Sequence, residues 1–236
     1  MSLPVIETPR YSCTLPVTEK EINYRPFLVG EQKILLMHQE GDDPTTLSKD
    51  TLRLMQACIC DDDVFVNTLP MADVEYLFLQ VRIKSAGETV DVQIECDECK
   101  EFNDVRIDLN SHVLHKPEII PDNNLKLTDE ISIDLRYPSI DELTDIDAKR
   151  EDYDMMFDII NLTVDKVING DEVHTRDDFS KEDLDKFIEG MSIDMLDSIN
   201  NFIKAQPSLS ITNEFECKKC GAFNVNTMSG IDSFFV

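Results

Sequence analysis

The sequence has few basic residues and no long apolar run. Its 236 residues include 22 Lys and Arg against 48 Asp and Glu, a formal net charge of −26, which repels nucleic-acid phosphates and anionic membranes. No stretch approaches the roughly 20 apolar residues that span a bilayer, and the first residues lack the basic and apolar regions of a secretion signal. We therefore expect a cytoplasmic protein that binds neither nucleic acid nor membrane.

Signals for catalysis are also missing. The chain has only seven glycines, and it contains no Gly-rich phosphate loop, no nucleophile elbow and no His-Glu-x-x-His helix. The acidic run at residues 61–63 lacks the spaced oxygen ligands and the turn glycine of a calcium loop, so we expect a solvated turn there. These absences predict a protein that is not an enzyme.

Seven cysteines are present, and without a secretion signal they indicate reduced thiols or metal ligands rather than disulfides. Four of them belong to a repeated pattern, Glu-Cys-x-x-Cys-x-x-Phe-Asn, at residues 95–103 and 216–224. Two Cys-x-x-Cys pairs can supply the tetrahedral thiolate shell that zinc prefers. We predict a structural zinc site, with iron as the minor alternative, whose ligands are Cys96, Cys99, Cys217 and Cys220.

The alternatives are two packed pairs of reduced thiols or two redox-active dithiols. Acidic neighbours such as Glu95 and Glu216 disfavour a free thiolate, and a redox thiol needs a helix N-terminus rather than a strand. A catalytic zinc keeps one open position, which four cysteines fill. His112 and His115 are less favoured as ligands, and the remaining thiols are expected to be small buried side chains: Cys13, Cys58 and Cys60.

Hydrophobic periodicity predicts the elements. A hairpin is expected around residues 11–27. Near the other end of the chain, Ser180 and Ser192 are predicted to be the N-caps of two helices, which end by Pro207. Ser139 and Glu142 have the spacing of a capping box. Helices are predicted at residues 29–38, 46–58, 71–84 and 153–167, and strands at 90–94, 105–109, 125–127, 131–137, 209–215 and 223–225.

Together these elements predict an α+β fold. It comprises an N-terminal region of hairpin and helices (1–89), a discontinuous unit (90–138 and 207–236) whose small antiparallel sheet carries both Cys-x-x-Cys knuckles in a zinc-ribbon-like arrangement, and a helical insert between the knuckles (139–206). The insert carries 19 acidic and 7 basic residues, which favours a solvated face over an acidic binding surface. The apolar tail at 233–236 is expected to pack on this protein or on a partner.

Several segments carry a family resemblance. The residues MSLPVIETP at 1–9, YRPFLVGEQK at 24–33, LRYPS at 135–139 and, most specifically, DVEYLFLQVRIKS at 73–85 resemble the baseplate hub assembly family of T-even-type contractile-tailed phages. The resemblance implies a late viral protein that works in the cytoplasm of the infected cell, with the tail baseplate of the virion as the other location. It implies a hub assembly chaperone or adaptor, or a hub subunit, whose partners are other baseplate hub and tail proteins. It implies no catalytic residue and no oligomeric state.

Two other classes of function compete with this one. The net charge of −26 would also suit an acidic DNA mimic that inhibits a host nucleic-acid-binding protein, and the cysteines alone would suit a redox or metal-dependent enzyme. In the 73–85 segment, Phe78 is expected in the core, whereas Tyr76 and Arg82 are candidates for contact with a partner.

Overall fold

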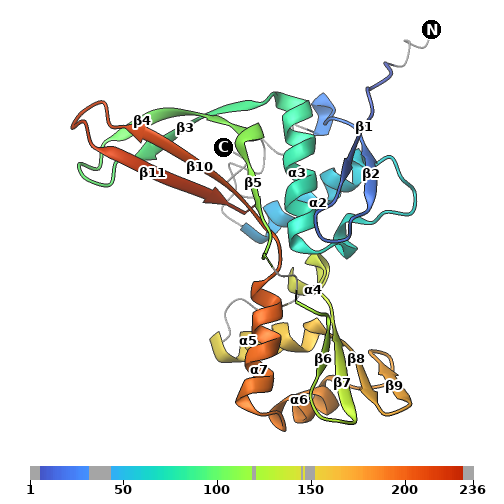
Figure 1. The fold of residues 1–236 in the computed structure, drawn as a ribbon. Coiled ribbons are helices and arrows are strands. Elements are labelled where there is room, and N and C mark those ends of the chain that lie inside the picture. The colour runs from blue at the N-terminus through green and yellow to red at the C-terminus, as the bar shows by residue number, and fades with distance from the viewer. Residues whose placement is uncertain (1–5, 32–43, 119–120, 145, 147–151, 231–236) are drawn as a thin grey trace. The chain divides into compact units, whose positions relative to one another are not determined.

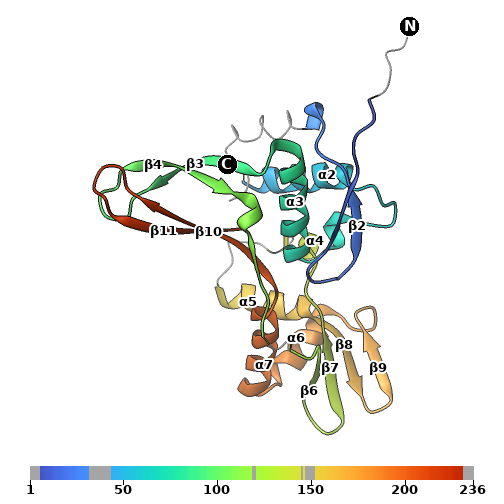
Figure 2. The same cartoon turned by 45° about the horizontal axis from the view of Figure 1, so that its top comes forward.

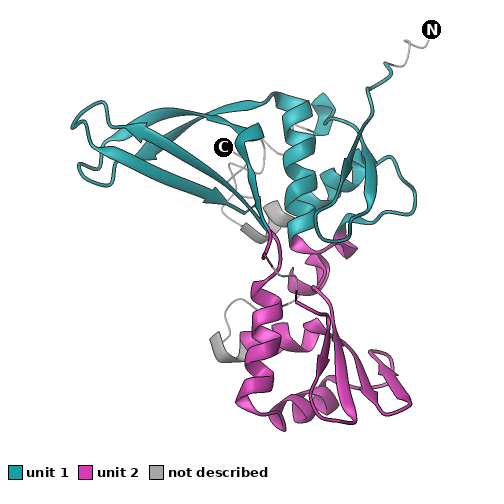
Figure 3. Cartoon of the chain, viewed as in Figure 1, with its two compact units in different colours: residues 1–66, 72–115, 208–236 teal, residues 67–71, 116–207 magenta. Residues whose placement is uncertain are grey.

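The computed structural model describes residues 6–31, 44–118, 121–144, 146 and 152–230, without the side chains of 44–48 and 152–154. The fold is α+β with small antiparallel sheets, as predicted. It divides into two compact units (Figure 3): unit 1 contains residues 1–66, 72–115 and 208–236, and unit 2 contains 67–71 and 116–207. The predicted helix at 29–38 falls mostly outside the described residues, and the tail at 233–236 lies wholly outside them.

Unit 1 begins with the predicted hairpin. Strand β1 (Tyr11–Thr14) pairs antiparallel with β2 (Glu21–Tyr24). Helix α2 (Pro44–Cys58) follows and confirms the helix predicted at 46–58. The acidic run forms a turn in which the Asp61 carboxylate accepts from the backbone and side-chain amides of Asn23 at 2.6 and 3.0 Å. That carboxylate therefore joins the turn to β2.

Helix α3 (Met71–Ala86) lies at the centre of unit 1 and confirms the helix predicted at 71–84. Its predicted core face, Val74, Leu77, Phe78 and Val81, is fully buried, and Leu79 is buried as well. Asp73 is also fully buried, and its carboxylate accepts from the backbone amides of Val17 and Thr18 at 2.7 and 3.0 Å. A buried carboxylate needs such donors to offset its desolvation, so Asp73 fastens the β1–β2 turn to α3.

Two long hairpins complete unit 1. The first joins β3 (Thr89–Glu95) to β4 (Phe102–Asp108), and the second joins β10 (Ser208–Glu216) to β11 (Phe223–Ser229). The short strand β5 (Val113–His115) pairs with the start of β10. In both Figure 1 and Figure 2 the hairpins run side by side, and their facing sides bury apolar residues such as Val92, Ile107 and Ile211. Segments far apart in sequence thus form two small sheets that lie beside each other.

Unit 2 is built on a four-stranded antiparallel sheet of order β6-β7-β8-β9. The strands are β6 (Asn124–Lys126), β7 (Ile131–Leu135), β8 (Val164–Asn169) and β9 (Glu172–Thr175). Its helices are α4 (Ile140–Thr144), α5 (Asp152–Thr163), α6 (Lys181–Glu189) and α7 (Ile193–Lys204). Sheet and helices share a core that includes Ile133, Ile160, Ile188 and Ile199.

One predicted boundary in unit 2 is wrong. The helix predicted at 153–167 ends at Thr163, and the chain enters β8 at Val164. The β-branched residues of β8 favour a strand. In addition, Nη1 of Arg176 donates to the carbonyl oxygens of Asn161, Leu162 and Val164 at 3.1, 3.2 and 2.7 Å. Helix ends leave such carbonyls without intrahelical partners, so Arg176 caps α5 from outside the helix.

The predicted helix starts are confirmed. Ser180 is the N-cap of α6 in a capping box with Asp183, and Ser192 is the N-cap of α7. Ser139 and Glu142 form the predicted capping box, because the Glu142 carboxylate accepts from the Ser139 amide at 2.9 Å and the Ser139 Oγ accepts from the Glu142 amide at 3.4 Å. In the part of the chain that the structure describes, no helix is both long and apolar enough to cross a membrane.

Candidate metal centre

Each Cys-x-x-Cys pair occupies the turn of one long hairpin. The Cys96 amide donates to the Glu101 carbonyl at 2.9 Å, and the Cys217 amide donates to the Ala222 carbonyl at 2.9 Å. The residue after the second cysteine has a positive φ in both turns, 59° at Lys100 and 74° at Gly221. The repeated sequence therefore folds into two knuckles of the same backbone shape.

The structure brings the four predicted ligands together. The Sγ atoms of Cys96, Cys99, Cys217 and Cys220 all lie within 4.8 Å of one another. Across the two hairpins, the sulfurs of Cys96 and Cys220 are 3.7 Å apart, and those of Cys99 and Cys217 are 3.6 Å apart. Metal–sulfur bonds of about 2.3 Å in a tetrahedron require sulfurs about 3.8 Å apart. The cluster has the dimensions of a four-thiolate metal site and could hold one ion.

Two buried asparagines cross between the knuckles. The Asn103 Nδ2 lies 3.6 Å from the Cys217 sulfur, and its Oδ1 accepts from the Lys218 amide at 3.0 Å. Asn224 repeats this geometry in the other direction: its Nδ2 lies 3.6 Å from the Cys96 sulfur, and its Oδ1 accepts from the Asp97 amide at 2.9 Å. Hydrogen bonds of this kind orient metal ligands and stabilise thiolate charge.

The two asparagines were not among the residues predicted from the sequence. Asn103 and Asn224 are only 3% and 4% exposed, although each follows an exposed phenylalanine at the start of its strand. The signal was present, because Asn is the last residue of the repeated pattern in both copies. A polar residue repeated at the same distance from two cysteine pairs is a candidate hydrogen-bond donor to them.

Hydrogen bonding separates the thiol pKa values. The backbone amide of Cys220, followed by the Lys219 amide and the Asn103 side chain, lowers the pKa of Cys217 to about 6. The corresponding amide of Cys99, with Glu98 and Asn224, lowers the pKa of Cys96. For Cys220, the Ala222 amide favours the thiolate, but bonds to the other sulfurs and burial outweigh it and raise the pKa to about 12. Hydrogen bonding thus favours the thiolate form of the first cysteine in each knuckle.

The rival ligands lie elsewhere. A ring nitrogen of His112 is 2.9 Å from the Leu109 carbonyl, and one of His115 is 2.6 Å from the Ser210 Oγ. Of the remaining cysteines, Cys58 is buried as expected, whereas Cys13 and Cys60 are partly exposed. Among the described residues, the four-cysteine cluster is the only group of three or more His, Cys, Asp or Glu side chains close enough to hold one ion.

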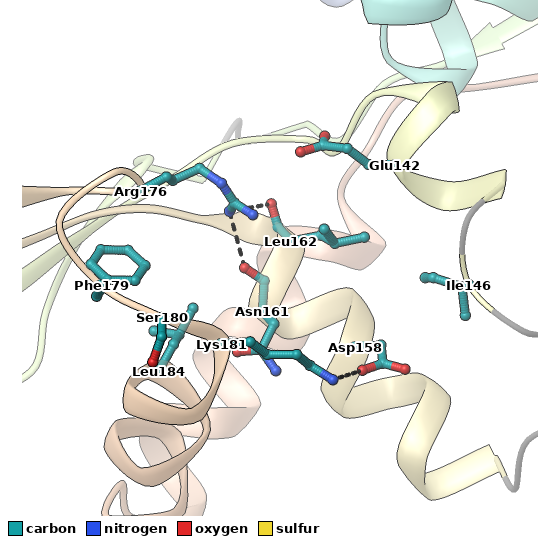
Figure 4. Close-up of a pocket in the computed structure, with 10 residues that line it drawn as sticks. All are labelled: Glu142, Ile146, Asp158, Asn161, Leu162, Arg176, Phe179, Ser180, Lys181 and Leu184. Carbon is teal, nitrogen blue, oxygen red and sulfur yellow. Dashed lines mark hydrogen bonds and ion pairs between the residues drawn. The ribbon is translucent and has the colours of Figure 1, made fainter.

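Unit 2 contains a pocket of about 520 Å³ between α5, α6 and the segment before α6 (Figure 4). Its two cationic side chains already have partners. Arg176 caps the end of α5, and the Lys181 ammonium contacts the Asp158 carboxylate at 2.6 Å. Burial lowers the pKa of Arg176. These charges therefore hold α5, α6 and the connecting segment together.

Comparison with known proteins agrees with the sequence resemblance. A family model described as T4 bacteriophage base plate protein matches residues 8–236. No curated protein and no solved structure matches the chain. The match includes both cysteine knuckles and the whole of unit 2. The chain therefore belongs to the T4 bacteriophage base plate protein family, as its sequence segments predict.

Proposed function

We propose that this protein is a non-enzymatic assembly factor of the baseplate hub, either a chaperone or adaptor for hub proteins or a subunit of the hub. The observation that carries the proposal is the family match over residues 8–236, which makes a role in the phage baseplate the starting point. The hub is the finer assignment, and it rests on the resemblance of the segments at 1–9, 24–33 and 73–85. The work is done in the cytoplasm of the infected cell.

Zinc is the metal that the proposal assigns to the cluster. Four thiolates at tetrahedral spacing suit zinc best, and iron in the same cage is the alternative. Cys96, Cys99, Cys217 and Cys220 would hold the ion, and it would supply a crosslink rather than a reaction because no coordination position is left open. The crosslink would join the β3–β4 hairpin to the β10–β11 hairpin, although Cys99 and Cys217 are 118 positions apart in the sequence.

The charge of the chain supports an adaptor. A net charge of −26 steers association toward basic partner surfaces and disfavours premature contact with other acidic subunits. Tyr76 and Arg82 of α3, the two candidates for partner contact, are half-buried. The β3–β4 and β10–β11 hairpins, which expose large apolar side chains such as Phe102 and Phe223, are the better candidates for the partner surface.

The test is capture of the tagged full-length chain from infected cells at intervals, together with deletion of its gene. We expect hub proteins in the captured complexes and unfinished hub intermediates in the deletion. Mass spectrometry of purified tails separates a chaperone, which is absent from them, from a subunit, which is present. Normal tails assembled without the gene would refute the proposal, and recovery of host nucleases or repressors alone would favour the DNA mimic.

A further inference from the structure

The outer edge of β11 carries unpaired backbone groups. Among the described strands, β11 pairs only with β10. In an antiparallel ladder, opposite residues alternate between hydrogen-bonded and non-hydrogen-bonded pairs. The bond from the Cys217 amide to the Ala222 carbonyl makes these two residues a hydrogen-bonded pair and so determines which residues of β11 face β10. Asn224, Asn226 and Met228 accordingly direct their N–H and C=O groups toward β10. Phe223, Val225 and Thr227 direct theirs away from it.

The neighbouring edges are protected by charge, and β11 is not. The same alternation places Asp91 and Glu95 at the outer edge of β3, Asp104 and Arg106 at that of β4, and Glu214 and Glu216 at the far edge of β10. Charged side chains at an edge discourage the addition of another strand. The seven residues of β11, FNVNTMS, contain no charge. Of the four strands in the two hairpins, β11 alone has an unguarded edge.

Apolar exposure coincides with this edge. Phe223 and Val225 are 67% and 52% exposed, and they lie on the face opposite the buried Asn224. Directly across the ladder from them, on the same face, are Glu216 and Glu214 of β10. A strand added to β11 would place its side chains beside the two apolar residues. The two carboxylates of β10 would lie two strands away, roughly 9–10 Å, a distance that the long side chains of Lys and Arg can span.

We propose that β11 is the docking edge for an extended segment of a partner protein, which adds as a further strand beside Phe223, Val225 and Thr227. The segment would alternate, with apolar and basic residues on the face shared with Phe223 and Glu214, because the carboxylates of β10 complement Lys or Arg. A second copy of this chain fits less well, since two chains of net charge −26 repel and β11 itself has no basic residue to complement the β10 carboxylates. The inference rests on the proposed function, in which that partner is a baseplate protein.

Two valines of the same sheet provide a matched test. Val225 on β11 is 52% exposed, and Val113 on β5, at the opposite edge of the sheet, is 50% exposed. Each is changed to Asp in the full-length chain, and the affinity for the purified baseplate protein that the wild type captures is measured. We expect Val225→Asp to weaken binding at least about 10-fold, because it creates a charged edge. Val113→Asp should bind as the wild type does.

Amide exchange followed by NMR distinguishes strand addition from other contacts and checks the folding of each variant. In the free chain the amides of Phe223, Val225 and Thr227 should exchange faster than those of Asn224, Asn226 and Met228. Addition of the purified partner should slow the first three. Val225→Thr remains β-branched and uncharged, so it should retain binding. Retained binding would show that Val225→Asp loses affinity because it places a charge at the edge of β11.

The outcomes separate the two proposals. If the wild type captures no baseplate protein, the proposed function fails, and this inference fails with it. If wild type and Val225→Asp bind equally, or if the partner leaves exchange at Phe223, Val225 and Thr227 unchanged, only the docking edge is refuted. A concentration-dependent dimer of the free chain that Val225→Asp abolishes would overturn the heterologous partner in favour of a second copy.

Discussion

The side-chain amide of Asn103 donates to the sulfur of Cys217, 114 positions further along the chain, and Asn224 donates in the same way to the sulfur of Cys96. Each asparagine also holds its own turn, since Asn103 Nδ2 lies 2.9 Å from the Glu101 carbonyl and Asn224 Nδ2 lies 2.9 Å from the Ala222 carbonyl. One amide thus connects its own knuckle to the opposite one. The cysteine cluster of the candidate metal centre is therefore held together by two asparagines as well.

Replacement of either asparagine by Ala should weaken the centre. Asn103→Ala leaves the Lys218 amide without its acceptor and the Cys217 sulfur without its donor. We expect metal affinity to fall about 10- to 100-fold, the usual cost of losing a partner of a metal ligand, and the free energy of unfolding to fall by about 1–3 kcal/mol. Competition with a chromogenic chelator and denaturant titration measure the two effects.

Asn213 provides the control for that substitution. It lies on β10, and its Nδ2 is buried without a hydrogen-bond partner. Asn213→Ala therefore removes a donor that makes no bond, and metal affinity should stay at the wild-type value. Equal losses in Asn103→Ala and Asn213→Ala would mean that truncation of any asparagine in the hairpins weakens the site, and that Asn103 has no special role.

The clustering of the four cysteines could be predicted from the sequence because their spacing is local and repeated. The Cys-x-x-Cys pairs lie in turns whose backbone shape follows from neighbouring residues, and the two pairs are alike. The asparagine bonds could not be assigned, because their acceptors are 114 and 128 positions away and such contacts depend on the register in which the hairpins meet. Helix α5 shows the same limit: Arg176 ends it by capping carbonyls 12 to 15 positions earlier.

Loss of one cysteine should release the metal and disorder the hairpins. The wild-type chain should carry about one zinc ion, as four thiolates in one shell imply. Cys217→Ser should carry much less, and chelation of the wild type should lower its melting temperature, because a structural ion contributes its binding energy to folding. Elemental analysis and thermal denaturation with and without chelator provide the measurements.

Cys60→Ser is the matched control for this prediction, since Cys60 lies outside the cluster. It should keep both the metal and the melting temperature. A Cys217→Ser chain that stays fully folded and loses only a thiol–disulfide activity would instead support the redox dithiol alternative.

The residue after the second cysteine has a positive φ in both knuckles, but it is Lys100 in one and Gly221 in the other. Exchanging the residue type at these two positions should therefore change stability in opposite directions. Lys100 adopts φ = 59° where the other knuckle has Gly221 at 74°, and a side chain in this region costs about 1–2 kcal/mol. Lys100→Gly should therefore stabilise unit 1 by about 0.5–1 kcal/mol after the greater chain entropy of glycine is subtracted.

Gly221→Ala should act in the reverse direction and destabilise by about 1 kcal/mol. Its Cβ would meet only the Glu216 Oε1 at 3.7 Å, an ordinary contact, so the cost comes from the backbone. Denaturant titration of the metal-loaded chains measures both changes. Destabilisation by Lys100→Gly would show that its ion pair with Glu95, 3.5 Å long and exposed, outweighs the strain.

In unit 2, the carboxylate of Glu142 should make stability depend on pH. Burial alone would raise its pKa, but bonds from Arg136 and from the amide and hydroxyl of Ser139 lower the pKa to about 2. The two bonds from Arg136 are 2.8 and 2.5 Å long. Because the pKa is lower in the folded chain, this contribution is complete above the ordinary value near 4.5 and is lost as the pH falls toward 2.

Glu142→Gln should therefore lower the free energy of unfolding at pH 7 by about 1–2 kcal/mol, a figure reduced for solvent screening of a side chain that is 29% exposed. The difference from wild type should shrink between pH 4.5 and pH 2. Metal release in acid affects both chains alike and cancels in the comparison. The control is Glu130→Gln, an exposed carboxylate in the β6–β7 turn, which should match the wild type throughout. A Glu142→Gln deficit that stays constant down to pH 2 would show that the side chain contributes through packing and hydrogen bonding rather than through its charge.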